Sequence, residues 1–443
     1  MLGERGLASA FSWSAFSKAD ALKRRLLFTI GALLVYRLGS YIPLSGVNPD
    51  VMAGFARENA NGFLGMLDMF SGGALGRATI MTLNIIPYIT ASIMVQLLTV
   101  ILPHFEVLRK DGESGRRKLN QYTRYLTVVL ASFEAYGIAV GLEHVQQLVL
   151  DPGLFFRLTT VVTLVGSTLF LVWLGEQITS RGVGNGSSMI IYTGIVANLP
   201  QAAFRALELG RAGALSILGF FIALLLVAAV ITFVVFMERA HRRLTVQYPK
   251  RQVGSRLMQG GGSYLPIKLN ISGVLPPIFA NSVLMFPALL SNMASVRADG
   301  WIGGILGMLT HGNPVFICLY VFLIVFFSFF YTSIVFNPEE TADGLKKNHG
   351  FVPGYKPGEA TAQYFDYLLT RLTVLGAAYL SCVCVIPEVV MSQVTLSFFF
   401  SGTSVLIVVS VTMDLFSQVQ THLISHHYQG LLRQNQGMPS RRR

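Results

Sequence analysis

The run PVFICLYVFLIVFFSFFYTSIVF, residues 314–336, carries no charged residue and decides the class of fold. A helix needs about 20 apolar residues to cross about 30 Å of hydrocarbon, so this run is long enough to span a membrane. The chain of 443 residues is 52% hydrophobic and only 13% charged, whereas soluble proteins carry about 25% charged residues. The sequence therefore predicts a membrane protein.

Stretches of this kind recur along the chain and predict ten transmembrane helices. Their approximate limits are 26–44, 78–102, 123–142, 156–175, 187–201, 213–237, 270–290, 314–336, 370–387 and 396–417. The stretch 187–201 is the shortest and needs local thinning of the bilayer or snorkelling flanks. The first is too long for a secretory signal and lacks a small-residue cleavage site, so we expect it to be retained.

The distribution of Lys and Arg supports this number of spans. With both termini in the cytoplasm, 27 of the 34 Lys and Arg residues fall on the cytoplasmic side, which is the positive-inside bias. We expect a cytoplasmic segment 1–25, an N-terminal half 26–210, a C-terminal half 211–420 and a cytoplasmic tail 421–443. Halves of this kind often form inverted repeats with a pathway at their interface.

Ionisable residues within the spans are few, namely Arg37, Glu134 and Asp414, and we expect each to lie near a span end or to snorkel. A secondary transporter of a small solute would need such groups near the midplane. An intramembrane enzyme would need facing catalytic groups. The chain also lacks the sequence motifs of nucleotide hydrolysis and of metal or serine hydrolases. A passive pathway is favoured, and the small-solute transporter remains the alternative.

The cysteines predict no metal site, disulfide or cofactor. Cys318, Cys382 and Cys384 all lie within expected spans, and residues two apart on a helix face different ways. The glycines at 182, 184 and 186 lack the strand and third glycine of a dinucleotide fingerprint. They indicate a tight cytoplasmic turn that enters a helix, with Asn185 and Gly186 as turn residues.

The segment GFLGMLDMFSGG, residues 62–73, is apolar but too short to cross a membrane. It predicts either an interfacial helix or a short helix folded into a cavity within the protein. Pro87, in the span that follows, is expected to kink its helix.

Two long basic cytoplasmic loops, residues 238–269 and 337–367, stand out from the other connections. They can be topology anchors that contact anionic headgroups, or docking sites for an acidic protein or for RNA. Their length favours docking, because orientation needs only charge near the membrane.

Six segments together resemble the SecY family of bacterial protein-conducting channels. They are SGGALGRA (71–78), NIIPYITASI (84–93), KDGESGRRKLNQYTRY (110–125), WLGEQITSRGVGNG (173–186), FNPEETADGLKKN (336–348) and GTSVLIVVSVTMDL (402–415). The resemblance extends from about residue 20 to about residue 430. It implies an all-α polytopic fold: ten transmembrane helices in two pseudo-symmetric five-helix halves, a clamshell around an hourglass pore.

The resemblance places isoleucines at the pore ring, at Ile85, Ile89, Ile191, Ile278 and Ile407. Isoleucine is stiff and offers water no hydrogen bond, so a ring of isoleucines can keep a narrow constriction dry. Ser187 departs from the family, because related proteins have an apolar residue at that ring position.

The resemblance also implies a re-entrant plug helix over 63–73 and a lateral gate between the helices expected to start at Ala78 and Asn270. The plug residues are Phe63, Leu64, Met66, Leu67, Met69 and Phe70. The gate residues are Gln96, Asn270, Pro276 and Pro277. We expect Gln96 and Asn270 to contact each other across the closed gate and the two prolines to loosen their helix.

The two basic loops match the surface on which the family binds its partners. The implied docking residues are Arg242, Arg243, Lys250, Arg251, Lys346, Lys347 and Lys356. Lys356 departs from the family, in which close relatives carry arginine. The implied partners are the SecA ATPase and the ribosome at these loops, the SecE and SecG membrane subunits, signal sequences and nascent chains, and membrane lipids. The resemblance implies a passive channel in the bacterial inner membrane, without catalytic residues or cofactors.

Overall fold

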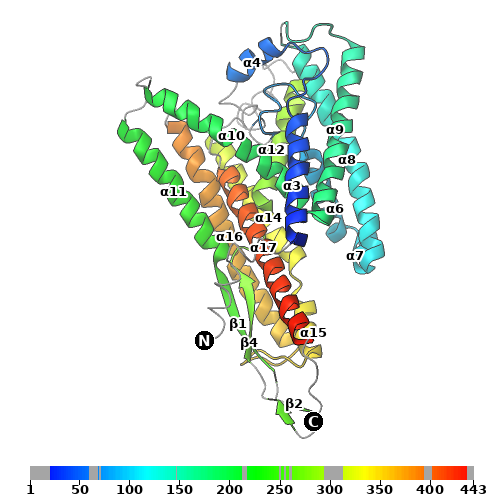
Figure 1. Cartoon of the computed structure of the whole chain (residues 1–443), viewed down its shortest axis with the longest axis vertical. Helices are drawn as coiled ribbons and strands as arrows, with labels where there is room; N and C mark the ends of the chain where they lie inside the picture. Colours follow the sequence, from blue (N-terminus) through cyan, green and yellow to red (C-terminus); the bar gives the residue numbers. More distant parts are fainter. Residues whose placement is uncertain are drawn as a thin grey trace. The chain divides into compact units, whose positions relative to one another are not determined.

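A computed structural model describes residues 20–58, 68, 71–145, 147–211, 217–248, 251–253, 256–258, 262–293, 313–393 and 402–436. Each of the ten expected spans overlaps one helix within these residues (Figure 1). These helices are α3 (Asp20–Gly39), α6 (Ile86–Ile101), α8 (Gly112–Glu143), α9 (Leu154–Arg181), α10 (Gly186–Arg211), α11 (Ile217–Arg239), α12 (Leu275–Met293), α14 (Pro314–Val335), α16 (Glu359–Gln393) and α17 (Gly402–Gln436). Three shorter helices are α4 (Pro49–Glu58), α7 (Pro103–Lys110) and α15 (Pro338–Lys347).

Several of these helices can cross a membrane by length and composition alone. Among the described residues, five spans meet this test, and a sixth is added if α6 and α7, bent by 101° at their junction, count as one. The protein is therefore a multi-pass membrane protein of mostly helical structure.

The second span begins later than expected. Residues 78–85 form successive turns, and α6 starts only at Ile86. Ala78 and Asn84 have φ of 43° and 52°, a left-handed conformation that an α-helix cannot contain. The expected helix start at Ala78 is therefore wrong.

Pro87, Pro276 and Pro277, in the two helices expected to line the gate, lie in the first helical turn. Pro87 directly follows Ile86, the first residue of α6, and Pro276 and Pro277 directly follow Leu275, the first residue of α12. The first N–H groups of a helix have no intrahelical partner, so proline there removes no hydrogen bond. Pro87 was expected to kink α6, and Pro276 and Pro277 were expected to loosen α12. Neither expectation fits a proline in the first helical turn.

The chain divides into two compact units. Unit 1 comprises Met1–Ile89, Leu126–Pro200 and Val411–Arg443, and unit 2 comprises Thr90–Tyr125 and Gln201–Ser410. Four helices, α6, α8, α10 and α17, contribute residues to both units. The two units therefore contain different residues from the two halves, 26–210 and 211–420, that the sequence predicts.

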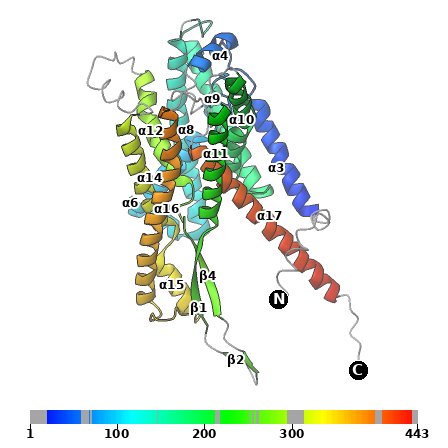
Figure 2. The ribbon, with the colours of Figure 1, turned by 90° about the vertical axis from the view of Figure 1, so that its left-hand side faces the viewer.

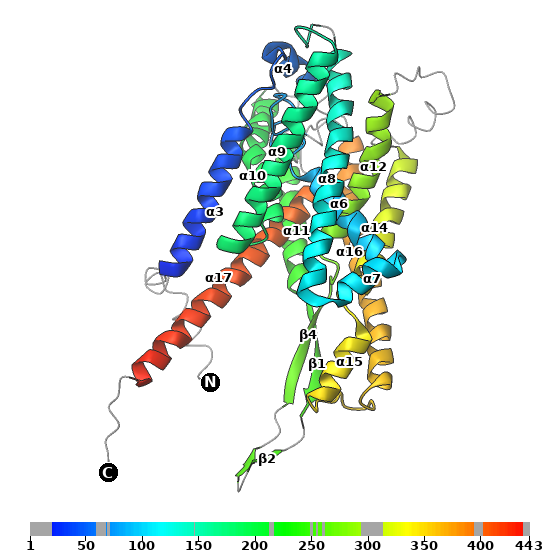
Figure 3. The ribbon, with the colours of Figure 1, turned by 90° about the vertical axis from the view of Figure 1, so that its right-hand side faces the viewer.

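Unit 1 has a core in which small residues permit close helix approach. Ala131, Ala135 and Ala139 recur every four residues along α8 and are buried. They pack in one cluster with Phe156 and Leu164 of α9, and Figure 3 shows α8 and α9 side by side. Small side chains on one face are typical of tightly packed membrane helices.

Unit 2 combines membrane helices with a β-hairpin. α14 contacts both α12 and α16, and Phe279 of α12 packs edge-on against Phe327 of α14, with ring centroids 5.7 Å apart. Strands β1 (His241–Gln247) and β4 (Gly262–Lys268) pair antiparallel, and β2 (Arg251–Val253) pairs with β3 (Arg256–Met258). Figure 2 shows the β1–β4 ribbon beside α15.

Candidate functional site

The two long basic loops form one folded body, which we call the docking platform: β1, β4, α15 and the first turns of α16. Leu244 and Ile267 of the hairpin are buried in one core cluster with Ala342 of α15 and Phe365 of α16. At the base of the hairpin, the Leu269 N–H donates to the Ala240 carbonyl at 2.9 Å. The sequence predicted two separate loops, and the structure joins them.

A backbone bridge joins the two loops directly. Gln247 N–H donates to the Phe351 carbonyl at 2.9 Å, and Phe351 N–H donates to the Gln247 carbonyl at 3.0 Å. This reciprocal pair is an antiparallel bridge at Gln247, which also pairs with Gly262 of β4. Because the two residues are far apart in sequence, no local pattern could have predicted the contact.

The second loop is ordered by helix capping. The Asn337 side-chain oxygen accepts from the backbone N–H groups of Glu339 and Glu340 at the start of α15, as is usual for an N-cap asparagine. Lys346 and Lys347 lie in its last turn, where cations favour the carbonyl end of the helix dipole.

Lys356 lies on an exposed turn between α15 and α16. The Lys356 carbonyl accepts a hydrogen bond from Thr361 Oγ1 at 2.8 Å, and the neighbouring Tyr355 stacks on Tyr364 with ring centroids 4.1 Å apart. The backbone of the turn is therefore held while Lys356 remains exposed.

The outward face of the hairpin is basic and aromatic. Register places Arg243 opposite Pro266 and Thr245 opposite Tyr264, and Tyr264 is 63% exposed. His241 and Lys268 continue this exposed face. We call Arg243, Tyr264 and Lys268 the hairpin face.

The other predicted docking residues of the first loop have different positions. Arg242 is exposed but pairs with Ile267, on the face that turns toward the platform core. Arg251 begins β2, and Lys250 lies outside the described residues.

Helix α7, which connects α6 to α8, belongs to unit 2, like the docking platform. Arg109 Nη2 donates to the Ile334 carbonyl in the last turn of α14 at 2.8 Å, which satisfies one of the unpaired carbonyls at that helix end. Lys110 donates to Glu106 at 2.7 Å, and this hydrogen bond holds the pKa of the Glu106 carboxyl below its usual range.

The five isoleucines expected at the pore ring are all at least partly buried. Ile85, Ile191 and Ile407 are buried, at 1%, 6% and 2% exposure, and Ile89 and Ile278 are partly buried. Ile85, Ile89 and Ile191 belong to unit 1, and Ile278 and Ile407 to unit 2. Ser187, in the first turn of α10, donates its hydroxyl to Asn185 Oδ1 at 2.8 Å.

Asn270, which was expected at the lateral gate, is buried, and both polar atoms of its side chain are hydrogen-bonded. Its amide donates to Glu238 Oε1 at 2.9 Å and to the Gly273 carbonyl at 3.1 Å, and its oxygen accepts from Ser272. Gln96 is partly buried on α6. The expected contact between Gln96 and Asn270 stays a prediction.

The plug residues Phe63, Leu64, Met66, Leu67, Met69 and Phe70 lie outside the described residues. The described part of its flank, Asp68 and residues 71–76, is held by polar contacts. Gly76 N–H donates to Asp68 Oδ1 at 2.6 Å, and Gly73 N–H donates to the Asp68 carbonyl at 2.8 Å.

Arg37 contacts this flank, which the sequence did not predict. Its Nη1 donates to the Gly72 carbonyl at 3.0 Å, although an arginine near a span end was expected to snorkel. The sequence shows only that Arg37 and Arg77 are cations outside the basic cytoplasmic loops. It does not indicate the contact with Gly72.

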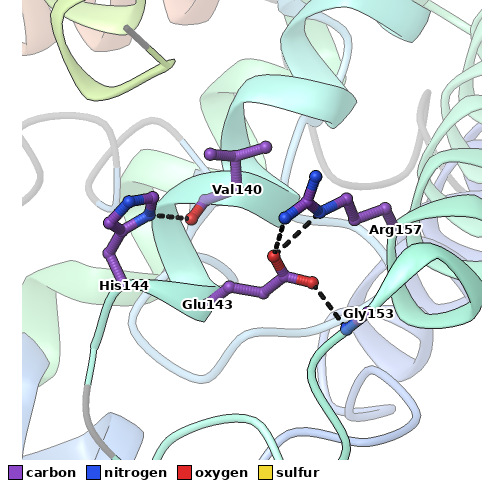
Figure 4. Close-up of polar contacts among 5 residues, drawn as sticks. All are labelled: Val140, Glu143, His144, Gly153 and Arg157. Carbon is purple, nitrogen blue, oxygen red and sulfur yellow. Dashed lines mark hydrogen bonds and ion pairs between the residues drawn. The ribbon is translucent and has the colours of Figure 1, made fainter. Parts of the chain in front are cut away.

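An ion pair joins α8 to α9 at the Glu143 end of α8 (Figure 4). Arg157 Nε and Nη2 lie 2.8 and 2.6 Å from Glu143 Oε2, and Gly153 N–H donates to Glu143 Oε1 at 3.1 Å. The loop that follows pairs with the chain at Val47, through the bridge to Val149. This contact engages both carboxylate oxygens of Glu143 and joins the two ends of the α8–α9 connection.

The described residues contain no group of three His, Cys, Asp or Glu side chains placed to hold a metal ion. Of the cysteines, Cys318 and Cys382 are exposed and Cys384 is buried, and all three are free thiols.

Comparisons with known proteins agree over nearly the whole chain. The family model SecY matches residues 79–416. The chain is 50% identical over 428 residues to the protein translocase subunit SecY of Rickettsia bellii, covering 94% of this chain and 98% of that protein. It is 50% identical over 424 residues to the protein of the same name from Escherichia coli K12, covering 95% and 96%.

Solved structures show the same fold at low sequence identity. A structure described as a protein conducting channel matches with a TM-score of 0.66 at 16% identity, covering 91% of this chain and 93% of that one. One concerned with the plug domain of the SecY protein, stabilising the closed state and maintaining a membrane seal, matches at 0.63 and 19%, with the same coverage. Sec61 in a canine ribosome-channel complex matches at 0.62 and 16%, again over 91% and 93%. The folded architecture, the motifs and the identity over almost the full length together establish that this chain belongs to the SecY family.

Proposed function

We propose that this protein is the central pore subunit of a bacterial Sec translocon, a passive channel for unfolded polypeptides. The observation that carries the proposal is the 50% identity, over 95% of the chain, to a protein translocase subunit. The same channel would release transmembrane segments sideways into lipid. Burying an apolar side chain contributes about 1.5–3 kcal/mol, so this partition needs no catalytic group.

We place the protein in the bacterial inner membrane with both termini in the cytoplasm, the orientation supported by the excess of Lys and Arg in alternate loops. The two halves, 26–210 and 211–420, would form the two sides of the clamshell. The docking platform then faces the cytoplasm, and the Glu143–Arg157 pair faces the other side.

The ring of Ile85, Ile89, Ile191, Ile278 and Ile407 would seal the pore around a passing chain. Their burial, complete or partial, supports this role, because an apolar side chain on the outer surface of a membrane helix would be exposed in the isolated chain, as Phe322 of α14 is at 63%. An uncharged narrow constriction excludes water and ions when empty.

The segment 63–73 would be the plug that lies against this ring at rest, and α6 and α12 would line the lateral gate. Gln96, Asn270, Pro276 and Pro277 keep their proposed places at the gate. Asn270 would do so through its bond to Glu238, which ties the segment just before α12 to the end of α11.

The docking platform would receive the partner that supplies energy, either a translating ribosome or the SecA ATPase. Its support is that both basic loops share one core and one backbone bridge, so a force applied at one loop reaches the other. The hairpin face offers cations and an exposed aromatic ring to a phosphate backbone or an acidic surface. The SecE and SecG subunits would pack on the membrane-facing helices.

The proposal is tested by reconstituting the purified protein, with its small partner subunits, into proteoliposomes. SecA, ATP and a preprotein are added, and protection of the preprotein from external protease is measured. ATP-dependent protection supports the channel. Uptake of a small solute without preprotein protection would favour the transporter instead.

A further inference from the structure

We infer that Arg37 and Arg77 hold the C-terminal flank of the plug segment at its resting position, by donating together to the carbonyl oxygen of Gly72. The inference rests on the proposed function, because it takes 63–73 to be the plug. It adds two positioning residues that lie outside the plug itself.

Both guanidinium groups bind one carbonyl. Arg37 Nη1 lies 3.0 Å and Arg77 Nη2 lies 3.1 Å from the Gly72 oxygen. A carbonyl has two lone pairs, so the arginine pair fills its hydrogen-bonding capacity. Hydrogen bonds from a charged donor are about twice as strong as neutral ones.

The arginine pair gains its remaining contacts from neighbours on and after α3. Both cations lie over the Tyr41 ring, with Arg37 and Arg77 Cζ at 5.4 and 4.3 Å from its centroid. Arg77 Nη2 also donates to the Ser40 carbonyl at 3.3 Å. Arg37 Nη2 donates to the Tyr41 hydroxyl at 3.3 Å. Within the described residues, the ion pairs involve other side chains, so this positive pair is held by carbonyl dipoles and by the ring and hydroxyl of Tyr41.

The backbone at the contact requires glycine. Gly72 and Gly73 have φ of 72° and 81°, the left-handed region that favours glycine. A Cβ on Gly72 would lie 2.7 Å from Arg37 Nη1 and 3.0 Å from Gly194 Cα of α10. Glycine at this turn therefore lets the Gly72 carbonyl accept from the two arginines and lets the backbone pack against α10.

Other bonds fix the same turn. Tyr36, fully buried on α3, donates its hydroxyl to the Ser71 carbonyl at 3.2 Å, and Ser71 Oγ donates to the Asp68 carbonyl at 3.0 Å. Asn198 of α10 also reaches the Asp68 carbonyl, at 3.5 Å. The turn is thus attached to α3 and α10, and displacing the plug together with its flank requires breaking the arginine contacts.

The test measures resting ion conductance of the complete complex in planar bilayers, alongside SecA-driven translocation. The variants are R37Q/R77Q, the two single changes, and R37K/R77K. We expect the double glutamine variant to conduct about tenfold more at rest, equivalent to about 1.4 kcal/mol, with translocation retained. The single variants should fall in between, and lysine, which keeps the charge and a donor, should restore part of the seal.

Two controls make the outcome decisive. R157Q removes another partly exposed arginine of unit 1, one that pairs with Glu143, and should leave the resting conductance unchanged. Deletion of Phe63 to Leu67 tests the plug itself and should raise the conductance.

A leak from the deletion but none from any arginine variant overturns the inference and leaves the proposed function standing. No leak from the deletion counts against the plug assignment. A loss of translocation with no leak would assign the arginines a purely structural role and also overturn the inference.

Discussion

Gln247 and Phe351 exchange two backbone hydrogen bonds, of 2.9 and 3.0 Å, and thereby join two loops that are about a hundred residues apart in the sequence. Opposed residues that exchange both bonds in an antiparallel pair have Cα atoms about 5.5 Å apart. The bridge, with the shared core of Leu244, Ala342 and Phe365, makes the docking platform one body.

The variant Q247C/F351C should form a disulfide on mild oxidation, in a background with the three native cysteines replaced by serine. The expected Cα separation lies within the 4.4–6.8 Å that a disulfide accepts. Bridge formation is read from peptide mapping before and after reduction. T245C/F351C, shifted by two residues on the same strand face, is the matched control and should cross-link poorly. Equal cross-linking of both pairs would contradict a fixed register.

Charge reversal on the hairpin face, R243E/K268E, should weaken binding of ribosomes to the reconstituted complex. Each phosphate contact removed lowers the slope of log affinity against log salt by about 0.7–0.9, so the slope should fall by roughly 1.4–1.8. The measurement is a binding titration at several salt concentrations. R116E/R117E makes the same change in net charge on two exposed residues of α8. If both variants lose affinity and slope equally, the effect is general electrostatics and the hairpin face is no specific site.

The substitution G186A should destabilise unit 1, whereas G166A should not. A Cβ on Gly186 would overlap the Gly175 carbonyl of the neighbouring helix, while nothing lies within 4 Å of a Cβ on Gly166. Overpacking of this kind typically costs about 1–3 kcal/mol. Thermal unfolding of the detergent-solubilised complex compares the two. A midpoint for G186A equal to that of G166A would show that the α9–α10 turn relaxes without cost.

How much of this molecule could be predicted from sequence depends on the range of the interactions involved. Apolar runs and loop charges are local, and they located a helix at each of the ten expected spans. The start of α6 was missed because the left-handed residues Ala78 and Asn84 lie in an otherwise apolar run. That error also misplaced Pro87, which a later helix start puts in the first turn.

The unpredicted parts of the candidate site are long-range contacts. The Gln247–Phe351 bridge and the Arg37–Gly72 hydrogen bond join residues whose separation hides them from any local pattern. The charge of Arg37 is visible in the sequence, but its acceptor is a backbone carbonyl. Every residue has a backbone carbonyl, so no sequence pattern predicts which one accepts the bond. The proposed functional residues come from the family resemblance, and the contacts that hold them were visible only in the fold.

The central claim, that a polypeptide passes the ring of isoleucines, is tested most directly by site-specific photocrosslinking. A photoreactive residue is placed at Ile85, Ile191, Ile278 or Ile407 in turn, and a preprotein is arrested during SecA-driven translocation. Phe322, which is 63% exposed on the apolar helix α14, serves as the lipid-facing control. The account predicts cross-links to the arrested chain from all four ring positions and none from position 322. Cross-links to lipid from the ring positions, with none to the preprotein, would contradict it.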